Sequence, residues 1–354
     1  MYYNKYAIFV TLETKFTLRL FVHKLKFVKK RHIFLVAIIF GSLISTRNNV
    51  VRSQDPTFTQ FFSNPIYLNP ALAGSSGCPR VSLNYRNEWP QLTGNYVTYS
   101  AAFDTYSKGI QGGIGLIAMH DQQGQGTITT SMLGGIYSYN LKVNRKFSFM
   151  FGARAAWFQK FLDWDKLTFG DMIDPRRGFI YQTGDVPRGN GRRGFFDASA
   201  GFVGFGKNFY FGGAVHHLNR PDESMILGES RLPMRFTGHA GADIKLGNRG
   251  KYYSTTSIMP NIIYQYQNGF QELNIGTYVK YGNFTVGAWY RNRDAFILCF
   301  GITTDKFKLG YSYDITVSKL GNGISGGSHE VSMGFNLKCR RKPKNFRKIS
   351  CPSF

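Results

Sequence analysis

Charged residues and long apolar runs are both scarce in this chain of 354 residues. Asp, Glu, Lys and Arg together make up 18% of the chain, whereas a water-soluble domain normally carries about 25%. The longest apolar run, at residues 33–44, falls short of the roughly 20 residues that a membrane-spanning helix needs. These two shortages argue against an ordinary soluble globule and against a helical membrane protein.

Aromatic residues and glycine are abundant instead. The chain holds 32 Phe, 21 Tyr and 40 Gly, and aromatic side chains reach 16% of the total. The mean hydropathy is nevertheless only -0.24. In a membrane β-barrel the apolar residues occupy alternate strand positions, so the average stays polar while an apolar surface is built. The composition therefore favours a barrel.

The excess positive charge is concentrated at the two ends of the chain. The net charge is +24, but residues 1–53 hold ten Lys or Arg against the single acid Glu13. Residues 338–354 hold seven Lys or Arg and no acid. A nucleic-acid-binding protein carries its basic residues on a folded face or helix, so nucleic acid is not an expected partner.

The N-terminal segment has the pattern of an export signal. A basic cluster precedes the apolar run at residues 33–44, as in a secretory signal peptide. Val51 and Ser53 provide small side chains for cleavage before Gln54. Residues 1–53 are therefore predicted to be leader and signal peptide. An uncleaved anchor helix is the alternative.

Beyond residue 80, apolar residues recur at every second position. Phe147, Phe149 and Phe151 share one face of a predicted strand, and Ser148 and Arg154 lie on the other. Such strict alternation indicates half-buried antiparallel strands. The pattern predicts about fourteen strands, at residues 80–87, 96–104, 110–120, 127–140, 146–159, 194–205, 208–218, 233–246, 254–266, 271–281, 283–292, 295–304, 306–314 and 329–337.

Short and long connections alternate between these strands. The connections at 105–109, 141–145 and 206–207 are short, whereas those at 160–193 and 219–232 are long. Bacterial barrels have short periplasmic turns and longer external loops. A soluble β-sandwich would share the alternation of residues but not this parity of connections. The parity therefore indicates a membrane barrel.

Two segments flank the predicted barrel at 80–337. The strap, residues 54–79, carries Pro and Asn between aromatic residues, which excludes a regular helix or central strand and leaves aromatic side chains to bury. We expect it to pack inside or beneath the barrel, whose polar inward face implies a wet or plugged lumen. The expected fold is all-β: an antiparallel transmembrane β-barrel of about 14 strands, with this Pro/Asn-rich strap and a basic periplasmic C-terminal tail at 338–354.

Six stretches of the chain carry a family pattern: Gln54–Gly74, Tyr85–Pro90, Asn95–Ser100, Leu162–Gly178, Tyr311–Leu320 and Gly326–Glu330. Together they resemble the PorP/SprF family of type IX secretion system outer-membrane proteins of the Bacteroidetes, and are closer to the SprF gliding-motility branch. The motif in the strap is carried by Asp55, Pro56, Phe58, Gln60, Asn64, Pro65, Leu68, Asn69, Pro70 and Gly74.

The resemblance implies an outer-membrane location and a role in protein secretion. Its expected cargo is a large secreted adhesin, which the protein would help to export or to attach to the cell surface. Its expected partners are periplasmic and outer-membrane components of the secretion and gliding machinery, together with outer-membrane lipid. A strap that merely seals the lumen is the alternative to a strap that binds cargo.

The sequence gives little indication of a metal site or a catalytic site. His216 and His217 are adjacent, and neighbours on a regular strand point to opposite faces, so we do not expect them to share a metal ion. Hard cations favour several carboxylates, which makes a calcium site a weak prediction for Asp163, Asp165, Asp171 and Asp174. A solvated loop with salt bridges is favoured over that site. No cofactor and no catalytic residue is predicted.

Two of the four cysteines flank the basic tail. Cys339 and Cys351 are predicted to form a disulfide, because an oxidising periplasm permits one. Cys299 lies on an inward strand face and is predicted to be a free thiol. The tail is predicted to bind an acidic periplasmic partner or anionic lipid head groups through Arg340, Arg341, Lys342, Lys344, Arg347 and Lys348. A merely solvated tail is the alternative.

The sequence thus predicts a non-enzymatic outer-membrane protein that reaches its membrane by signal-peptide-dependent export. An outer-membrane diffusion porin is the alternative function, and a barrel enzyme is a third and less favoured hypothesis. The residues do not identify the cargo, nor whether it binds the lumen, the loops or the periplasmic rim.

Overall fold

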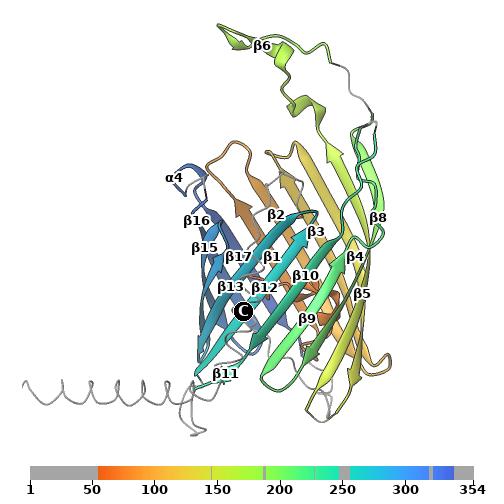
Figure 1. Ribbon diagram of the computed structural model, residues 1–354, viewed down its shortest axis with the longest axis vertical. Helices are drawn as coiled ribbons and strands as arrows, with labels where there is room; N and C mark the ends of the chain where they lie inside the picture. Colours follow the sequence, from red (N-terminus) through yellow and green to blue (C-terminus); the bar gives the residue numbers. More distant parts are fainter. Residues whose placement is uncertain are drawn as a thin grey trace, which may run out of the picture. The chain divides into compact units, whose positions relative to one another are not determined.

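The computed structural model describes residues 55–144, 146–185, 189–226, 228–246, 256–318 and 322–338. Contacts divide the chain into two units, Met1–Val51 and Arg52–Phe354. The described part of the second unit is an antiparallel β-barrel (Figure 1). The predicted leader lies outside the described residues, as does nearly all of the basic tail.

Fourteen strands close the barrel, and each is paired with its neighbours in chain order. The first strand, β1 (Arg80–Glu88), pairs with the last, β17 (Ser328–Asn336), so the ring has no free edge. A bilayer demands such closure because it offers no water to unpaired backbone groups. The other strands of the ring are β2 (Tyr96–Ser107), β3 (Gly112–Gln123), β4 (Ile128–Lys142), β5 (Ser148–Leu162), β8 (Arg192–Phe205), β9 (Phe209–His216), β10 (Arg235–Ala242), β12 (Thr256–Gln267), β13 (Phe270–Tyr281), β14 (Phe284–Arg291), β15 (Ala295–Thr303) and β16 (Phe307–Thr316).

One predicted strand is interrupted. The stretch at 233–246 forms β10 and then β11 (Ile244–Lys245), and both pair with β12. Asp243 lies between β10 and β11, and its backbone N–H donates to the carbonyl of Asn208 next to β9. The prediction of one unbroken strand is therefore wrong at this point. The existence and order of the fourteen barrel strands are confirmed.

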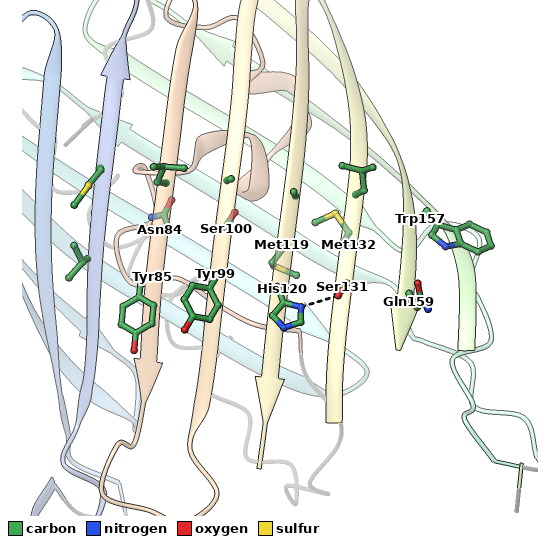
Figure 2. Close-up of a pocket in the computed structure, with 16 residues that line it drawn as sticks. Asn84, Tyr85, Tyr99, Ser100, Met119, His120, Ser131, Met132, Trp157 and Gln159 are labelled. Carbon is green, nitrogen blue, oxygen red and sulfur yellow. Dashed lines mark hydrogen bonds between the residues drawn. The ribbon is translucent and has the colours of Figure 1, made fainter. Parts of the chain in front are cut away.

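Burial alternates along each strand, as the period of two predicts. In β5 the side chains of Ser148 and Arg154 are buried, whereas Phe151 and Trp157 are exposed on the outer wall. Neighbouring strands keep the same rule: Figure 2 shows Tyr85, Tyr99 and Trp157 on the outer wall. On β5, the polar Ser148 and Arg154 therefore face the lumen, whereas Phe151 and Trp157 face outward.

Most of the long connections lie at one end of the barrel. They are residues 89–95, 163–191, 217–234 and 317–327, and the short turns 124–127, 268–269 and 292–294 lie at the same end. The opposite end has the short connections 108–111, 143–147, 206–208, 282–283 and 304–306, and also the stretch 243–255 between β10 and β12. Residues 163–191 contain η2 (Trp164–Lys166), η3 (Gly170–Met172), β6 (Ile173–Asp174) and β7 (Gly178–Phe179), and residues 317–327 contain α4 (Asn322–Ser325). We call these the long-loop end and the short-turn end. Among the described residues, no helix has the length and apolarity to cross a membrane.

The strap contains two short helical turns, α3 (Pro65–Leu68) and η1 (Pro70–Leu72), and an Asn-Pro pair begins each. Proline is suited to the first position of a helix because its missing N–H would have no partner there. Asn69 caps the second turn, since its side-chain oxygen accepts the N–H of Ala71 at 2.9 Å. The repeated Asn-Pro pattern thus folds the strap into compact turns that fit within the barrel.

Candidate functional site

The strap lies inside the barrel, one of the two positions predicted from its composition. Thr59, Gln60, Ala71 and Leu72 have no exposed side-chain surface. Their neighbours join two clusters of buried apolar residues with side chains from the barrel wall. The strap is therefore part of the core. Its removal would leave many buried side chains of the inner wall without their packing partners.

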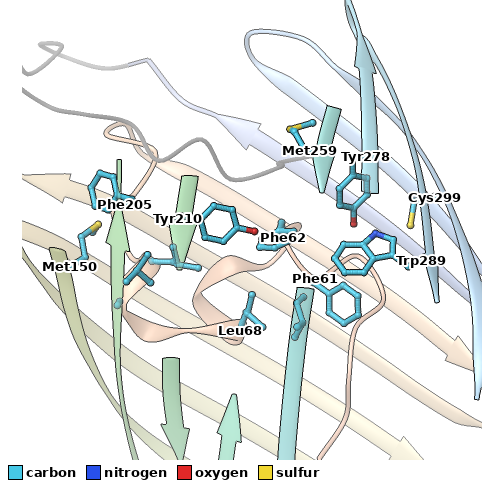
Figure 3. Close-up of a cluster of buried hydrophobic side chains, with 14 of the residues drawn as sticks. Phe61, Phe62, Leu68, Met150, Phe205, Tyr210, Met259, Tyr278, Trp289 and Cys299 are labelled. Carbon is cyan, nitrogen blue, oxygen red and sulfur yellow. The ribbon is translucent and has the colours of Figure 1, made fainter. Parts of the chain in front are cut away.

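Aromatic side chains of the strap pack on aromatic side chains of the wall (Figure 3). The ring centroid of Phe61 lies 4.9 Å from that of Trp289 on β14, and the centroid of Phe62 lies 5.9 Å from that of Tyr210 on β9. Fully burying such a side chain contributes about 1.5–3 kcal/mol. These contacts join the strap to β14 and β9.

Glu330 of β17 anchors the strap by hydrogen bonds. Its carboxylate accepts the backbone N–H of Thr59 at 2.6 Å and the Thr59 hydroxyl at 2.9 Å. Gln60 donates its side-chain amide to the Glu330 carbonyl at 3.0 Å and accepts the hydroxyl of Ser332 at 2.5 Å. All four residues are buried, so these bonds replace the solvation that burial removes.

Two arginines balance the buried acids around this anchor. Arg86 Nη2 lies 3.1 Å from Asp314 Oδ2, and Arg86 Nη1 lies 3.5 Å from Glu330 Oε2. Arg291 Nη1 lies 3.4 Å from the same oxygen of Asp314. Arg86 also donates to the Thr59 hydroxyl at 3.0 Å. The strap is thus bonded into a charge network in which removal of one partner leaves another charge uncompensated.

Asn69 ties the middle of the strap to three adjacent strands. Its side-chain amide donates to the carbonyls of Phe202 on β8 and Gly213 on β9, each at 3.1 Å. The same nitrogen lies 3.0 Å from Nε2 of His239 on β10. One side chain therefore fixes the strap against three strands.

Glycines in the wall make room for the strap backbone. A Cβ atom on Gly152 of β5 would lie 2.3 Å from the backbone nitrogen of Ala71, and one on Gly113 of β3 would lie 2.2 Å from the carbonyl oxygen of Ala73. Real Cβ atoms do not approach backbone this closely, so a larger residue would displace the strap. Gly113 and Gly152 are therefore points of close packing between the wall and the strap.

The strap leaves the lumen at the short-turn end beside Asp104 of β2. The Asp104 carboxylate accepts the N–H of Gly74 at 2.8 Å and pairs with Arg80 through two bonds of 2.9 Å. Gly74 has a φ of +70°, which glycine adopts without strain. Cys78, which follows, is disulfide-bonded, a bond that the sequence did not lead us to expect. Cys299 is free and buried, as predicted.

The described part of the strap begins toward the long-loop end, beside His217. His217 Nε2 lies 2.7 Å from Asp55 Oδ2, and its Nδ1 lies 2.7 Å from Asp197 Oδ1 on β8. Arg235 Nη1 of β10 lies 3.1 Å from the same Asp55 oxygen. We call these four residues the Asp55 latch.

The ring of His217 points into the lumen because β9 has already ended. His217 has a φ of 58°, so it does not continue the pleat, and its ring lies 6.5 Å from the ring of buried His216. The expectation that these neighbours point to opposite faces is therefore wrong. The cause is this local turn, and both ring nitrogens of His217 lie within hydrogen-bond distance of carboxylates.

Charge pairing shifts the pKa values in the latch. Burial alone would lower the pKa of His217, but the carboxylates of Asp55 and Asp197 outweigh it and raise the pKa to about 9. Burial alone would raise the pKa of Asp55, but positive charge on His217 and Arg235 holds it well below its ordinary value. At neutral pH the latch therefore joins two cations to two carboxylates.

The structure does not bring the four aspartates of the longest connection together. Asp163 caps η2, Asp171 accepts the N–H of Gly184 at 2.7 Å, and Asp174 accepts the N–H groups of two following residues at 2.8 Å. These backbone bonds lower the pKa values of Asp171 and Asp174. Within the described ranges, no group of three His, Cys, Asp or Glu has metal-binding geometry.

The remaining predicted residues fall outside the part of the chain that the structure describes. They are the disulfide pair Cys339 and Cys351 and the basic tail residues Arg340, Arg341, Lys342, Lys344, Arg347 and Lys348. Sequence reasoning also missed much of the receiving wall. Arg154 was predicted to lie on the polar face of its strand, but no role was predicted for Asp104, Asp197 or His239. Polar residues at the inward positions of otherwise apolar strands were the signal that could have found them.

A closed barrel with an apolar outer wall, a polar inner wall and short turns at one end defines an outer-membrane β-barrel protein. The chain matches the family model of the type IX secretion system membrane protein PorP/SprF over residues 50–335. It therefore belongs to the PorP/SprF family and is an outer-membrane component of the type IX secretion system. A search of curated proteins gives no match.

Solved structures with similar barrels share little sequence with this chain. Omp33 of Acinetobacter baumannii is 9% identical, with a TM-score of 0.39 and coverage of 74% of this chain and 100% of that one. The toluene transporter TbuX of Ralstonia pickettii is 10% identical, with a TM-score of 0.45 and coverage of 79% and 95%. The CymD monoaromatic hydrocarbon channel is 12% identical, with a TM-score of 0.42 and coverage of 80% and 94%. We draw no functional conclusion from these likenesses.

Replacement of Gly152 by valine should displace the strap. The new Cβ would meet the backbone of Ala71, and overpacking of this kind costs about 1–3 kcal/mol. Chymotrypsin should then cut after Phe58, Phe61 or Tyr67, as mass spectrometry of the digest would reveal. Gly135→Val is the matched control because nothing lies within 4 Å of its added Cβ. If chymotrypsin cut the strap equally slowly in both variants, the close packing of the strap against Gly152 would be contradicted.

The stability of the barrel should depend on pH through the Asp55 latch. The pKa of His217 is raised from 6.5 to about 9, so its contribution is complete below about pH 6.5 and is lost as the pH rises through 9. The pKa of Asp55 is lowered, so its contribution is lost only on acidification below about pH 4. His216 on β9 and Arg154 on β5 also face the latch.

Urea unfolding in lipid vesicles between pH 6 and pH 10 would measure this dependence. We expect the free energy of unfolding to fall between pH 6.5 and 9 in the natural chain and to stay flat in His217→Gln. His120→Gln, on the outer wall, is the control and should keep the dependence. An identical decline in His217→Gln would exclude His217 as its source.

Proposed function

We propose that this PorP/SprF protein is a non-enzymatic attachment component that supports export or surface attachment of a large secreted adhesin. It would be exported by a signal peptide cleaved before Gln54 and would act in the SprF-like gliding branch of the family. The observation that carries the proposal is the strap, whose Thr59, Gln60 and Leu72 are wholly buried within the barrel. A barrel filled in this way is suited to holding a partner at its surface.

The longest connection offers a surface for the adhesin. Its β6–β7 hairpin exposes large apolar side chains: Ile173 is 47% exposed, Phe179 60%, Ile180 49% and Tyr181 53%. Exposed apolar patches of this kind mark protein interaction sites. Residues 163–191 lie at the long-loop end, which faces the cell exterior in bacterial barrels. We therefore propose that the hairpin, rather than the lumen, holds the cargo.

The basic tail would make the contacts on the periplasmic side. Residues 338–354 follow β17, whose last residue lies at the short-turn end. Six basic residues, Arg340 to Lys348, would dock on an acidic component of the secretion and gliding machinery. The adhesin would then bind at the long-loop end of the barrel, and the periplasmic partner at the short-turn end.

Affinity purification from native membranes followed by mass spectrometry would test the two contacts separately. Phe179→Ser with Tyr181→Ser should lose the adhesin and keep the periplasmic partner, because only the apolar patch is changed. Deletion of residues 340–354 should lose the periplasmic partner and keep the adhesin. Ile226→Ala, at a residue 50% exposed in another long connection, is the control. Retention of the adhesin by the first variant would refute the hairpin as its site.

Conductance in planar bilayers would separate this proposal from a diffusion porin. The natural protein should carry little steady current, because the strap fills the lumen. Deletion of residues 55–74 should raise the current if the barrel stays folded, which heat-dependent migration on gels would verify. A large steady current through the natural protein would favour the porin.

A further inference from the structure

Two rows of outward-facing residues cross strands β17 and β1 to β5 on the outer wall. In the first row Tyr85 pairs with Tyr99, Tyr99 with His120, His120 with Ser131, and Ser131 with Gln159. In the second row, one outward position deeper, the paired residues are Met333, Leu83, Ala101, Ala118, Leu133 and Trp157. The two rows line one groove (Figure 2).

Small residues create the floor of this groove. Ala101 and Ala118 face outward between Leu83 on one side and Leu133 and Trp157 on the other. Alanine leaves the space that a longer side chain would fill, and the resulting groove has a volume of about 700 Å³. Elsewhere on the outer wall, β15 carries Phe296, Leu298 and Phe300 at its exposed positions. The groove is therefore a local hollow in an otherwise bulky apolar surface.

The rim of the groove toward the long-loop end is polar and ordered by hydrogen bonds. Nδ1 of His120 lies 2.9 Å from the hydroxyl of Ser131, and Nε2 of His120 lies 3.2 Å from the side-chain nitrogen of Gln122. Gln159 continues this row on β5. Each rim residue lies three positions from the end of its strand, at the level of Tyr85 and Tyr99. Tyrosines at this level form the interfacial girdle of a membrane barrel.

This polarity fits a molecule with a polar linkage at the interface and an apolar tail directed toward the membrane centre. A protein partner that covered the whole groove would have to bury His120, Ser131 and Gln159 against an apolar surface, which is costly without matching hydrogen bonds. No Lys or Arg lines the groove, so the rim suits carbonyl and hydroxyl groups better than a phosphate. The long-loop end places the site in the outer leaflet.

We propose that this groove is a specific site for one lipid of the outer membrane. An acyl chain lies on Ala101 and Ala118, and the ester or amide linkage above it bonds to Ser131 and Gln159, with His120 orienting the Ser131 hydroxyl. The two paired rows of the site project from the outer wall, apart from the long connection proposed to contact the adhesin. Lipid occupancy would rigidify β1 to β5, which form much of the wall behind the strap.

Native mass spectrometry of the detergent-solubilised full chain, titrated with dioleoyl phosphatidylethanolamine, tests the site. The natural protein should retain one lipid more tightly than all others. Ala118→Leu should weaken this binding at least about tenfold by filling the floor, and Ser131→Ala with Gln159→Leu should weaken it about tenfold through lost hydrogen bonds. Ala288→Leu, at an exposed alanine of β14, is the matched control and should bind as the natural chain does.

Three results would overturn the proposal. They are the absence of any singly retained lipid, equal weakening in Ala288→Leu and Ala118→Leu, and unchanged binding in Ala118→Leu. Protein purified directly from native membranes gives a second readout. An intact membrane lipid at the groove supports the proposal, whereas an acyl chain attached to a peptide would assign the groove to a lipid-modified protein instead.

Discussion

Every polar group enclosed by this barrel needs a partner, and the strap supplies many of them. The inner wall carries carboxylates and arginines that water cannot reach, and an unpaired buried charge is among the costliest features of a folded protein. Thr59 and Gln60 bond Glu330, and Gly74 bonds Asp104. Strap and wall therefore form one core together. Without the other, each would leave buried polar groups without hydrogen-bond partners.

Because strap and wall are complementary, the outer and inner faces of the barrel have different roles. The closed ladder pairs the backbone N–H and C=O groups of the strands, so none is left exposed to the bilayer. The outer wall can therefore carry apolar and aromatic side chains. The lumen is then free to be polar, provided that it is filled. With the strap inside the barrel, we propose that contact with other molecules uses the loops, the tail and the outer wall. Among the described residues, the exposed β6–β7 hairpin and the groove over Ala101 and Ala118 offer such surfaces.

The sequence predicted the barrel well because period-two alternation is a local signal. The faces of β5, the parity of the connections and the inward Cys299 all follow from it. The sequence did not predict which wall residues contact the strap, because contacts such as Asn69 with His239 join residues far apart in the chain. The inward turn of His217 depends on a single backbone angle, which composition and spacing do not encode.

Hydrogen–deuterium exchange of the natural protein in lipid nanodiscs tests the central claim most directly. If the strap is part of the barrel core, peptides covering residues 58–73 should exchange as slowly as those of β2 to β5, because their amides are buried and bonded. Peptides from residues 163–185 provide the fast reference. Exchange of the strap at the rate of that connection would contradict the account, since the lumen would then hold a loosely seated segment.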